Sequence, residues 1–88
     1  MAKIDHRTCA ADIVTDARQL YEAYIRNCDG LAWDGRPCPT WDDLLEKGTS
    51  VPSHWCAAVI ESRALAHYRE LLASGLSDAE ARGTAWPA

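Results

Sequence analysis

Cysteine and histidine are the residues of this sequence with the widest chemical range. The four cysteines are Cys9, Cys28, Cys38 and Cys56, and the chain has three histidines. No two cysteines have the Cys-x-x-Cys spacing, and a zinc site needs four ligands that converge. A helix between Cys9 and Cys28 would hold these two more than about 25 Å apart, which is too far for a disulfide. We expect reduced thiols and no bound metal or other cofactor, with a Cys28–Cys38 disulfide and a zinc site as the alternatives.

The side chains that could act as a nucleophile or a general acid are not spaced so that two of them would meet on one face of a helix. His54 and Cys56 lie two residues apart, so on a helix their side chains diverge by about 200°. Asp42 and Asp43 are neighbours at an expected helix start and do not converge either. Contact between Cys38 and one of the histidines stays open. Because the sequence also has no phosphate-binding glycine loop, it predicts a protein that is not an enzyme and has no catalytic residues.

Tryptophan is the unusual residue of the chain, which has four of them and no phenylalanine. A tryptophan side chain buries about 150–250 Å² and dominates small cores and interfaces alike. We expect Trp41 and Trp55 to clamp the loop at 29–40 onto a long helix at 52–74. Trp33, within that loop, is either a further core residue or an exposed contact residue, and the sequence leaves both interpretations open.

The loop and the helix start that follows it form the candidate binding surface. Loops on a rigid helical scaffold commonly carry binding groups. This segment combines an aromatic ring, an arginine and several acids, which suits a hot spot with a charged rim. Residues 29–50 are the acidic part of the chain, with a net charge of −3, and are either a solvated segment or a surface for a basic partner. The predicted partner-binding residues are Trp33, Asp34, Arg36, Asp42 and Asp43.

Length, charge and hydropathy bound the class of protein. A chain of 88 residues, of which 48% are hydrophobic, has the size of one domain, so we expect a single helical domain over residues 1–88. The net charge of −4 argues against a nucleic-acid binder, which depends on clustered cations. No apolar run approaches the about 20 residues of a membrane span, and the N-terminus lacks a secretory signal. We therefore expect a cytoplasmic protein with no membrane partner and no direct nucleic-acid partner.

Apolar spacing predicts an all-α fold, a small bundle of two longer and two short helices with a Trp- and Pro-rich loop. The helices are expected at 10–28, 41–47, 52–74 and 77–82. Thr8 suits the N-cap of the first helix and Gly30 a left-handed position just after it. Ser77 and Glu80 have the spacing of a capping box, which predicts the start of the last helix.

Two apolar segments are left without a partner by this arrangement. Residues 31–33 have strand character, but no second strand-like run is available to pair with them. The helix at 52–74 is apolar around much of its circumference, so it is either central or meets a partner. Its second apolar stripe, formed by Trp55, Val59 and Ala66, is a candidate surface for a homodimer.

One spacing pattern extends over residues 21–55. A helix with Tyr21-x-x-Tyr24 is followed by Gly30, Trp33, the run Gly35-x-Pro37-x-Pro39-x-Trp41, Leu44, and Trp55 near a further helix start. This pattern resembles a type of small protein widespread in bacteriophage and prophage genomes. The Thr-Ser-Val-Pro segment before Trp55 departs from the commoner, shorter connection of that group. The resemblance implies a phage accessory protein and assigns no site.

Small size, acidic balance, surplus tryptophan and the phage-like pattern together favour a binding function. The first hypothesis is a non-enzymatic phage protein that binds and inhibits a host defence protein in the bacterial cytoplasm, in the manner of anti-CRISPR inhibitors. The alternative is a structural or assembly accessory protein of the virion. A regulator that binds metal or nucleic acid ranks below both.

Overall fold

Four α-helices and one short 3₁₀ turn make up the computed structural model, which describes residues 4–87. The elements are η1 (His6–Thr8), α1 (Ala11–Asn27), α2 (Trp41–Glu46), α3 (Val51–Ala73) and α4 (Asp78–Ala85). No strand occurs in this described part of the chain. The all-α prediction, with two long and two short helices, is confirmed. Within residues 4–87, no helix combines the length and apolar character that a bilayer crossing requires.

The helix starts follow from local side-chain hydrogen bonds. Thr40 caps α2 and Ser77 caps α4, each in a reciprocal capping box with the residue three positions on, Asp43 and Glu80. The assignment of Thr8 as the N-cap of α1 is wrong. Thr8 belongs to η1, and the N-cap position of α1 is occupied by Ala10, which makes no side-chain cap.

The helix ends also differ from expectation in two places. Gly30 (φ +73°) is left-handed, as expected, but it is the second left-handed residue after α1, because Asp29 (φ +54°) precedes it in that conformation. The amide of Gly30 donates to the carbonyl of Ile25 at 2.8 Å, which closes a Schellman motif. At the other end of the chain, α4 runs past Gly83 to Ala85 because the tail is held: the Trp86 ring stacks on Tyr68, with ring centroids 5.5 Å apart.

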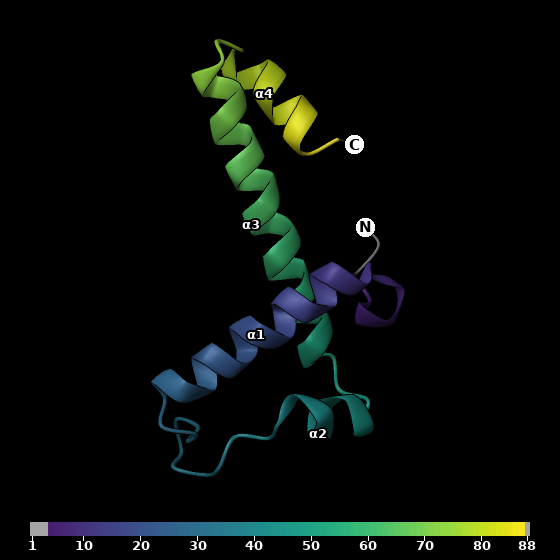
Figure 1. The fold of residues 1–88 in the computed structure, drawn as a ribbon, viewed down its shortest axis with the longest axis vertical. Coiled ribbons are helices and arrows are strands. Elements are labelled where there is room, and N and C mark those ends of the chain that lie inside the picture. The colour runs from purple at the N-terminus through teal and green to yellow at the C-terminus, as the bar shows by residue number, and fades with distance from the viewer. Residues whose placement is uncertain (1–3, 88) are drawn as a thin grey trace.

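The core lies where α1 crosses the first half of α3, with α2 packed beneath them (Figure 1). Tyr21 of α1 is its centre, because the rings of Trp41 and Trp55 pack against it with centroids 5.9 Å and 5.7 Å away. The buried members of the cluster are Ala17, Tyr21, Trp41, Leu44, Cys56 and Val59. Trp41 and Trp55, which were expected to clamp the loop onto α3, therefore both pack against Tyr21 of α1.

The second stripe of α3, a candidate surface for a homodimer, is covered over part of its length. The Trp55 ring packs edge-to-face on Tyr21 and at a tilt on Tyr24, both on α1, and Val59 is buried in the core. One turn further on, Arg63 pairs with Asp12 at 2.8 Å and Asp16 at 2.6 Å, both on α1. The contacts with α1 occupy Trp55 and Val59, whereas Ala66, the third residue of the stripe, is exposed.

Candidate functional site

The loop between α1 and α2 folds back on itself as a narrow hairpin. Leu31 and Pro37 form an isolated antiparallel bridge. The amide of Ala32 donates to the carbonyl of Arg36 at 2.7 Å, and that of Cys38 donates to Gly30 at 2.8 Å. The strand-like segment at 31–33 thus has a mate, contrary to expectation. The mate is the proline-containing chain just after the turn, in which Pro37 can supply only its carbonyl group.

Trp33 lies at the tip of this hairpin and is 98% exposed. The turn below it is closed by the amide of Gly35, which donates to the carbonyl of Ala32 at 2.9 Å, and Gly35 supplies the left-handed φ of +82°. The interpretation of Trp33 as a core residue is therefore wrong. Its side chain is exposed, and its contact with a partner stays a prediction.

Asp34 and Arg36 are brought together with Trp33 in the same turn. The carboxylate of Asp34 accepts from the amide of Arg36 at 3.1 Å and pairs with its guanidinium at 3.4 Å. An aspartate that bonds the backbone two residues on stabilises a turn. The charged groups flanking the exposed indole are therefore held in place by the turn itself.

Asp42 and Asp43 lie on a separate element, the first turn of α2, and neither is paired with a residue of the Trp33 turn. Asp43 accepts from the amide of Thr40 at 3.2 Å as part of the capping box. Asp42 pairs with Arg18 of α1 at 3.5 Å and stays largely exposed. Asp43 thus has a structural role as a cap, and Asp42 is the acid of the pair that remains open to a partner.

A hydrogen bond from the core fixes the base of the hairpin. The buried Tyr21 hydroxyl donates to the carbonyl of Pro39 at 2.7 Å, and burial is the main cause that raises the pKa of Tyr21. The tip of the hairpin is exposed, whereas the segment after its turn is held against the core through Pro39. A mobile loop loses conformational entropy when it binds a partner, and this hydrogen bond reduces that loss because the loop is already ordered in the free protein.

Replacement of Tyr21 by phenylalanine tests this connection. We expect Tyr21→Phe to lower the free energy of unfolding by about 1 kcal/mol, because the ring packing stays and one partly buried hydrogen bond is lost. Urea denaturation measures the change. Tyr24→Phe is the matched control, because the Tyr24 ring also stacks on Trp55 but is 48% exposed. Equal effects of the two substitutions would contradict a fixing role for the Tyr21 hydroxyl.

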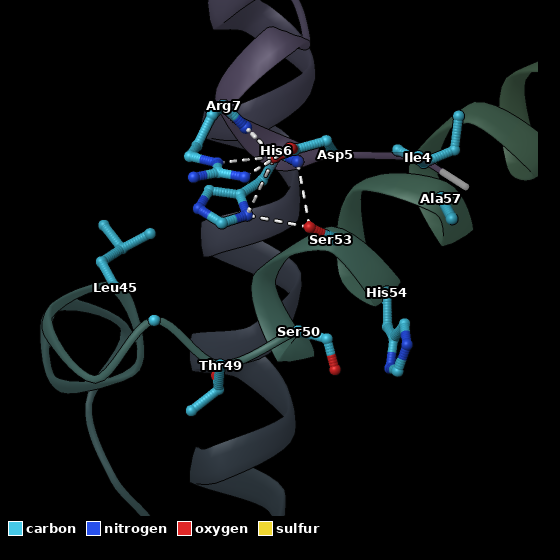
Figure 2. Close-up of a pocket in the computed structure, with 11 residues that line it drawn as sticks. Ile4, Asp5, His6, Arg7, Leu45, Thr49, Ser50, Ser53, His54 and Ala57 are labelled. Carbon is cyan, nitrogen blue, oxygen red and sulfur yellow. Dashed lines mark hydrogen bonds and ion pairs between the residues drawn. The ribbon is translucent and has the colours of Figure 1, made fainter. Parts of the chain in front are cut away.

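A second site is a cavity of about 730 Å³ between the N-terminal turn, the α2–α3 connection and the start of α3. His6, Arg7, Ser50, Ser53 and His54 are among the residues that line it (Figure 2). Ser53 Oγ lies 2.8 Å from His6 Nδ1 and accepts from the His6 amide at 3.0 Å. Sequence reasoning missed this pair because the residues are 47 positions apart and no motif marks either of them.

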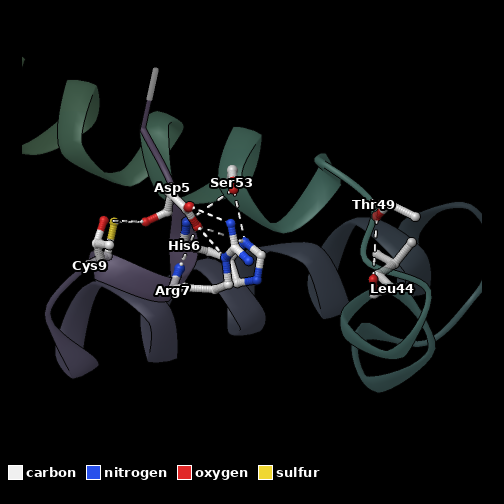
Figure 3. Close-up of polar contacts among 8 residues, drawn as sticks. Asp5, His6, Arg7, Cys9, Leu44, Thr49 and Ser53 are labelled. Carbon is white, nitrogen blue, oxygen red and sulfur yellow. Dashed lines mark hydrogen bonds and ion pairs between the residues drawn. The ribbon is translucent and has the colours of Figure 1, made fainter. Parts of the chain in front are cut away.

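The polar groups around His6 act mainly on one another (Figure 3). Arg7 donates to Asp5 from its amide at 2.9 Å and from Nη2 at 2.8 Å, and these bonds lower the pKa of Asp5 to about 2. Asp5 lies 3.9 Å from His6 Nδ1, the same nitrogen that meets Ser53. In a Ser-His-Asp triad the serine and the aspartate contact different ring nitrogens of the histidine, whereas Ser53 and Asp5 both face Nδ1 of His6. The contacts tie the N-terminal turn to α3.

The cysteines do not gather at either site. All four are free thiols, and Cys56 is fully buried in the core, where burial raises its pKa. Cys9 donates to the carbonyl of Asp5 at 3.3 Å. Over residues 4–87, no three side chains of His, Cys, Asp or Glu come together as metal ligands would.

No family model, curated protein or solved structure matches this chain.

Proposed function

We propose that this chain is a non-enzymatic binding protein that attaches to a host protein through the Trp33 hairpin. The observation that carries the proposal is the 98% exposure of Trp33 at the tip of a turn with fixed ends. Transfer of an indole of about 150–250 Å² from water into an apolar pocket contributes roughly 4–6 kcal/mol. Tryptophan is also among the residues most enriched at binding hot spots.

The shape and charge of the hairpin favour a protein as the partner. A projecting side chain needs a pocket in the partner, whereas small-molecule sites are concave. Asp29 and Asp34 are acids of the hairpin segment, and the whole chain carries −4, which disfavours a polyanion such as DNA. A pocket rimmed by basic residues fits this combination.

The biological setting of the proposal comes from the sequence pattern over residues 21–55. We propose a phage-encoded inhibitor that acts in the bacterial cytoplasm on a host defence protein. Within the pattern, Tyr21, Trp41 and Leu44 are buried in the core and account for the fold. Trp33 is the aromatic member that packing does not require, which is consistent with selection for contact with a partner. A virion accessory role is the alternative.

Capture from a lysate of phage-infected bacteria tests the proposal. The immobilised chain of 88 residues should retain one host protein at close to stoichiometric yield, and the host protein should be a subunit of a defence complex. A matrix that carries Trp33→Ala should retain little of it. Retention of a capsid or tail protein instead would support the virion role. Equal retention on both matrices would contradict the placement of the site on the hairpin.

The acidic rim should affect the rate of association more than the fold. We expect Asp34→Asn combined with Asp42→Lys to lower the association rate constant several-fold at low salt, because steering toward a basic pocket is weakened. Asn at position 34 keeps an oxygen acceptor for the Arg36 amide. Surface plasmon resonance at two salt concentrations measures the rates. Glu70→Lys, on the exposed surface of α3 outside the hairpin, is the control. An association rate that does not depend on salt or on these variants would exclude steering.

A further inference from the structure

The chain beyond Val59 forms an arm that has almost no core of its own. This C-terminal arm, residues 60–87, consists of the second half of α3 and the short α4, and it projects away from the α1–α3 crossing (Figure 1). Within the arm, Ala81 is the one residue that is buried. Its larger apolar side chains are half-buried or exposed: Ile60, Leu65, Tyr68, Leu71, Leu72, Leu76 and Trp86. An eight-residue helix such as α4 has little stability of its own in water.

The helix α4 covers only one edge of the apolar face of the arm. The Trp86 ring stacks on Tyr68, and its Nε1 donates to Glu61 at 3.1 Å. Leu65 and Leu72 lie about 40–60° around α3 from Tyr68 and are 38% and 39% exposed. Residues seven apart fall on almost the same line of a helix, as in the seam of a coiled coil. The uncovered edge is therefore a leucine seam parallel to the contact with α4.

The surface area of the chain is larger than a monomer of its mass requires. Its accessible surface is 6419 Å², against about 5,100 Å² for a typical folded monomer of this mass. Its radius of gyration is 15.9 Å, against about 12 Å for a compact domain of this length. The excess of about 1,300 Å² is spread over the whole elongated chain, the arm included, and is larger than the about 800 Å² that each partner buries in a standard interface.

We infer that a second copy of this chain covers the arm, with the Leu65–Leu72 edges of the two copies facing each other about a two-fold axis. Two arms supply four helices, which can enclose the apolar core that one arm lacks. The charge of the arm fits a self-interaction: four acids and three arginines, of net charge −1, are interspersed along residues 60–87. Two such surfaces repel each other little, whereas the strongly acidic segment at 29–50 suits a basic partner.

Pairing through the arms leaves the proposed binding sites free. The hairpin that carries Trp33 lies at the opposite end of the molecule from the tip of the arm (Figure 1). If the two arms run antiparallel, the dimer presents one Trp33 side chain at each of its outer ends. An oligomeric partner could engage both, which would raise the avidity without a new contact.

Sedimentation equilibrium of the full chain from about 1 to about 200 µM tests the inference. The wild-type mass should approach twice the 9.7 kDa of one chain. Leu65→Glu combined with Leu72→Glu should weaken dimerisation at least about 100-fold, because two carboxylates per chain would enter an apolar interface. The milder Leu72→Ala should weaken it about 10-fold and removes only atoms of a partly exposed side chain.

Leu45→Glu is the matched control, because Leu45 lies on α2, outside the arm, and is 39% exposed, as Leu72 is. It should leave the dimer intact, and far-ultraviolet circular dichroism should show native helicity for all variants that are compared. A wild-type chain that stays monomeric to the highest concentration overturns the inference. A dimer that persists in the folded Leu72→Ala and double-glutamate variants, or that Leu45→Glu disrupts equally, overturns the assignment of its interface to the arm.

Discussion

Trp41→Ala should lower the free energy of unfolding by about 3–5 kcal/mol. Trp41 is 3% exposed, begins α2 and packs against Tyr21 at a ring-centroid distance of 5.9 Å. Its removal would open a cavity between α1 and α2, where few other large side chains can move in. A small domain has only about 5–10 kcal/mol in total, so the variant should be largely unfolded at physiological temperature.

The same chemical change at Trp33 is the matched control for stability. Trp33 is 98% exposed, so Trp33→Ala should change the free energy of unfolding by less than about 0.5 kcal/mol. Urea denaturation followed by circular dichroism at 222 nm measures both variants. A Trp41→Ala protein as stable as Trp33→Ala would contradict the placement of the core between α1, α2 and α3.

Helix positions could be predicted from the sequence because apolar spacing and caps are local signals. The capping boxes at Thr40 and Ser77 fixed two starts within one residue. The ends were less certain where tertiary contacts decided them: α4 extends past Gly83 because Trp86 docks on Tyr68, 18 positions earlier. The left-handed conformation of Asp29, next to that of Gly30, could not be predicted, because aspartate adopts this conformation in some turns and not in others.

In the candidate site, too, the features set by neighbouring residues could be predicted, and those set by tertiary packing could not. The Trp33 turn could be predicted, because Trp33, Asp34 and Arg36 are neighbours in the sequence and Asp-Gly marks the turn. The exposure of Trp33 could not, since it depends on which ring fills the core, and Tyr21 with Trp41 fills it instead. The contact between His6 and Ser53 joins two elements that lie 47 positions apart in the sequence, so local spacing does not indicate it. The bare edge of the arm was likewise hidden, because periodicity indicates a helix face but not what covers it.

Trp33→Ala should weaken binding of the host partner by about 2 kcal/mol or more, which is about 30-fold in Kd. The physical reason is the loss of an indole that a partner pocket would desolvate, on a hairpin whose base is fixed by the bond from Tyr21 to Pro39. The effect should appear mainly in the dissociation rate, because the charged rim that steers association stays in place. Leu20→Ala, which truncates an exposed side chain on α1, should leave the affinity unchanged.

Isothermal titration of the captured host protein with wild type, Trp33→Ala and Leu20→Ala is the most direct test of a binding site on the hairpin. All three proteins should show the same thermal midpoint and helicity, so that a difference in affinity reports contact alone. We predict that Trp33→Ala binds at least about 30-fold more weakly and that Leu20→Ala binds like the wild type. A folded Trp33→Ala protein that binds with wild-type affinity would contradict the account and move the site away from the hairpin.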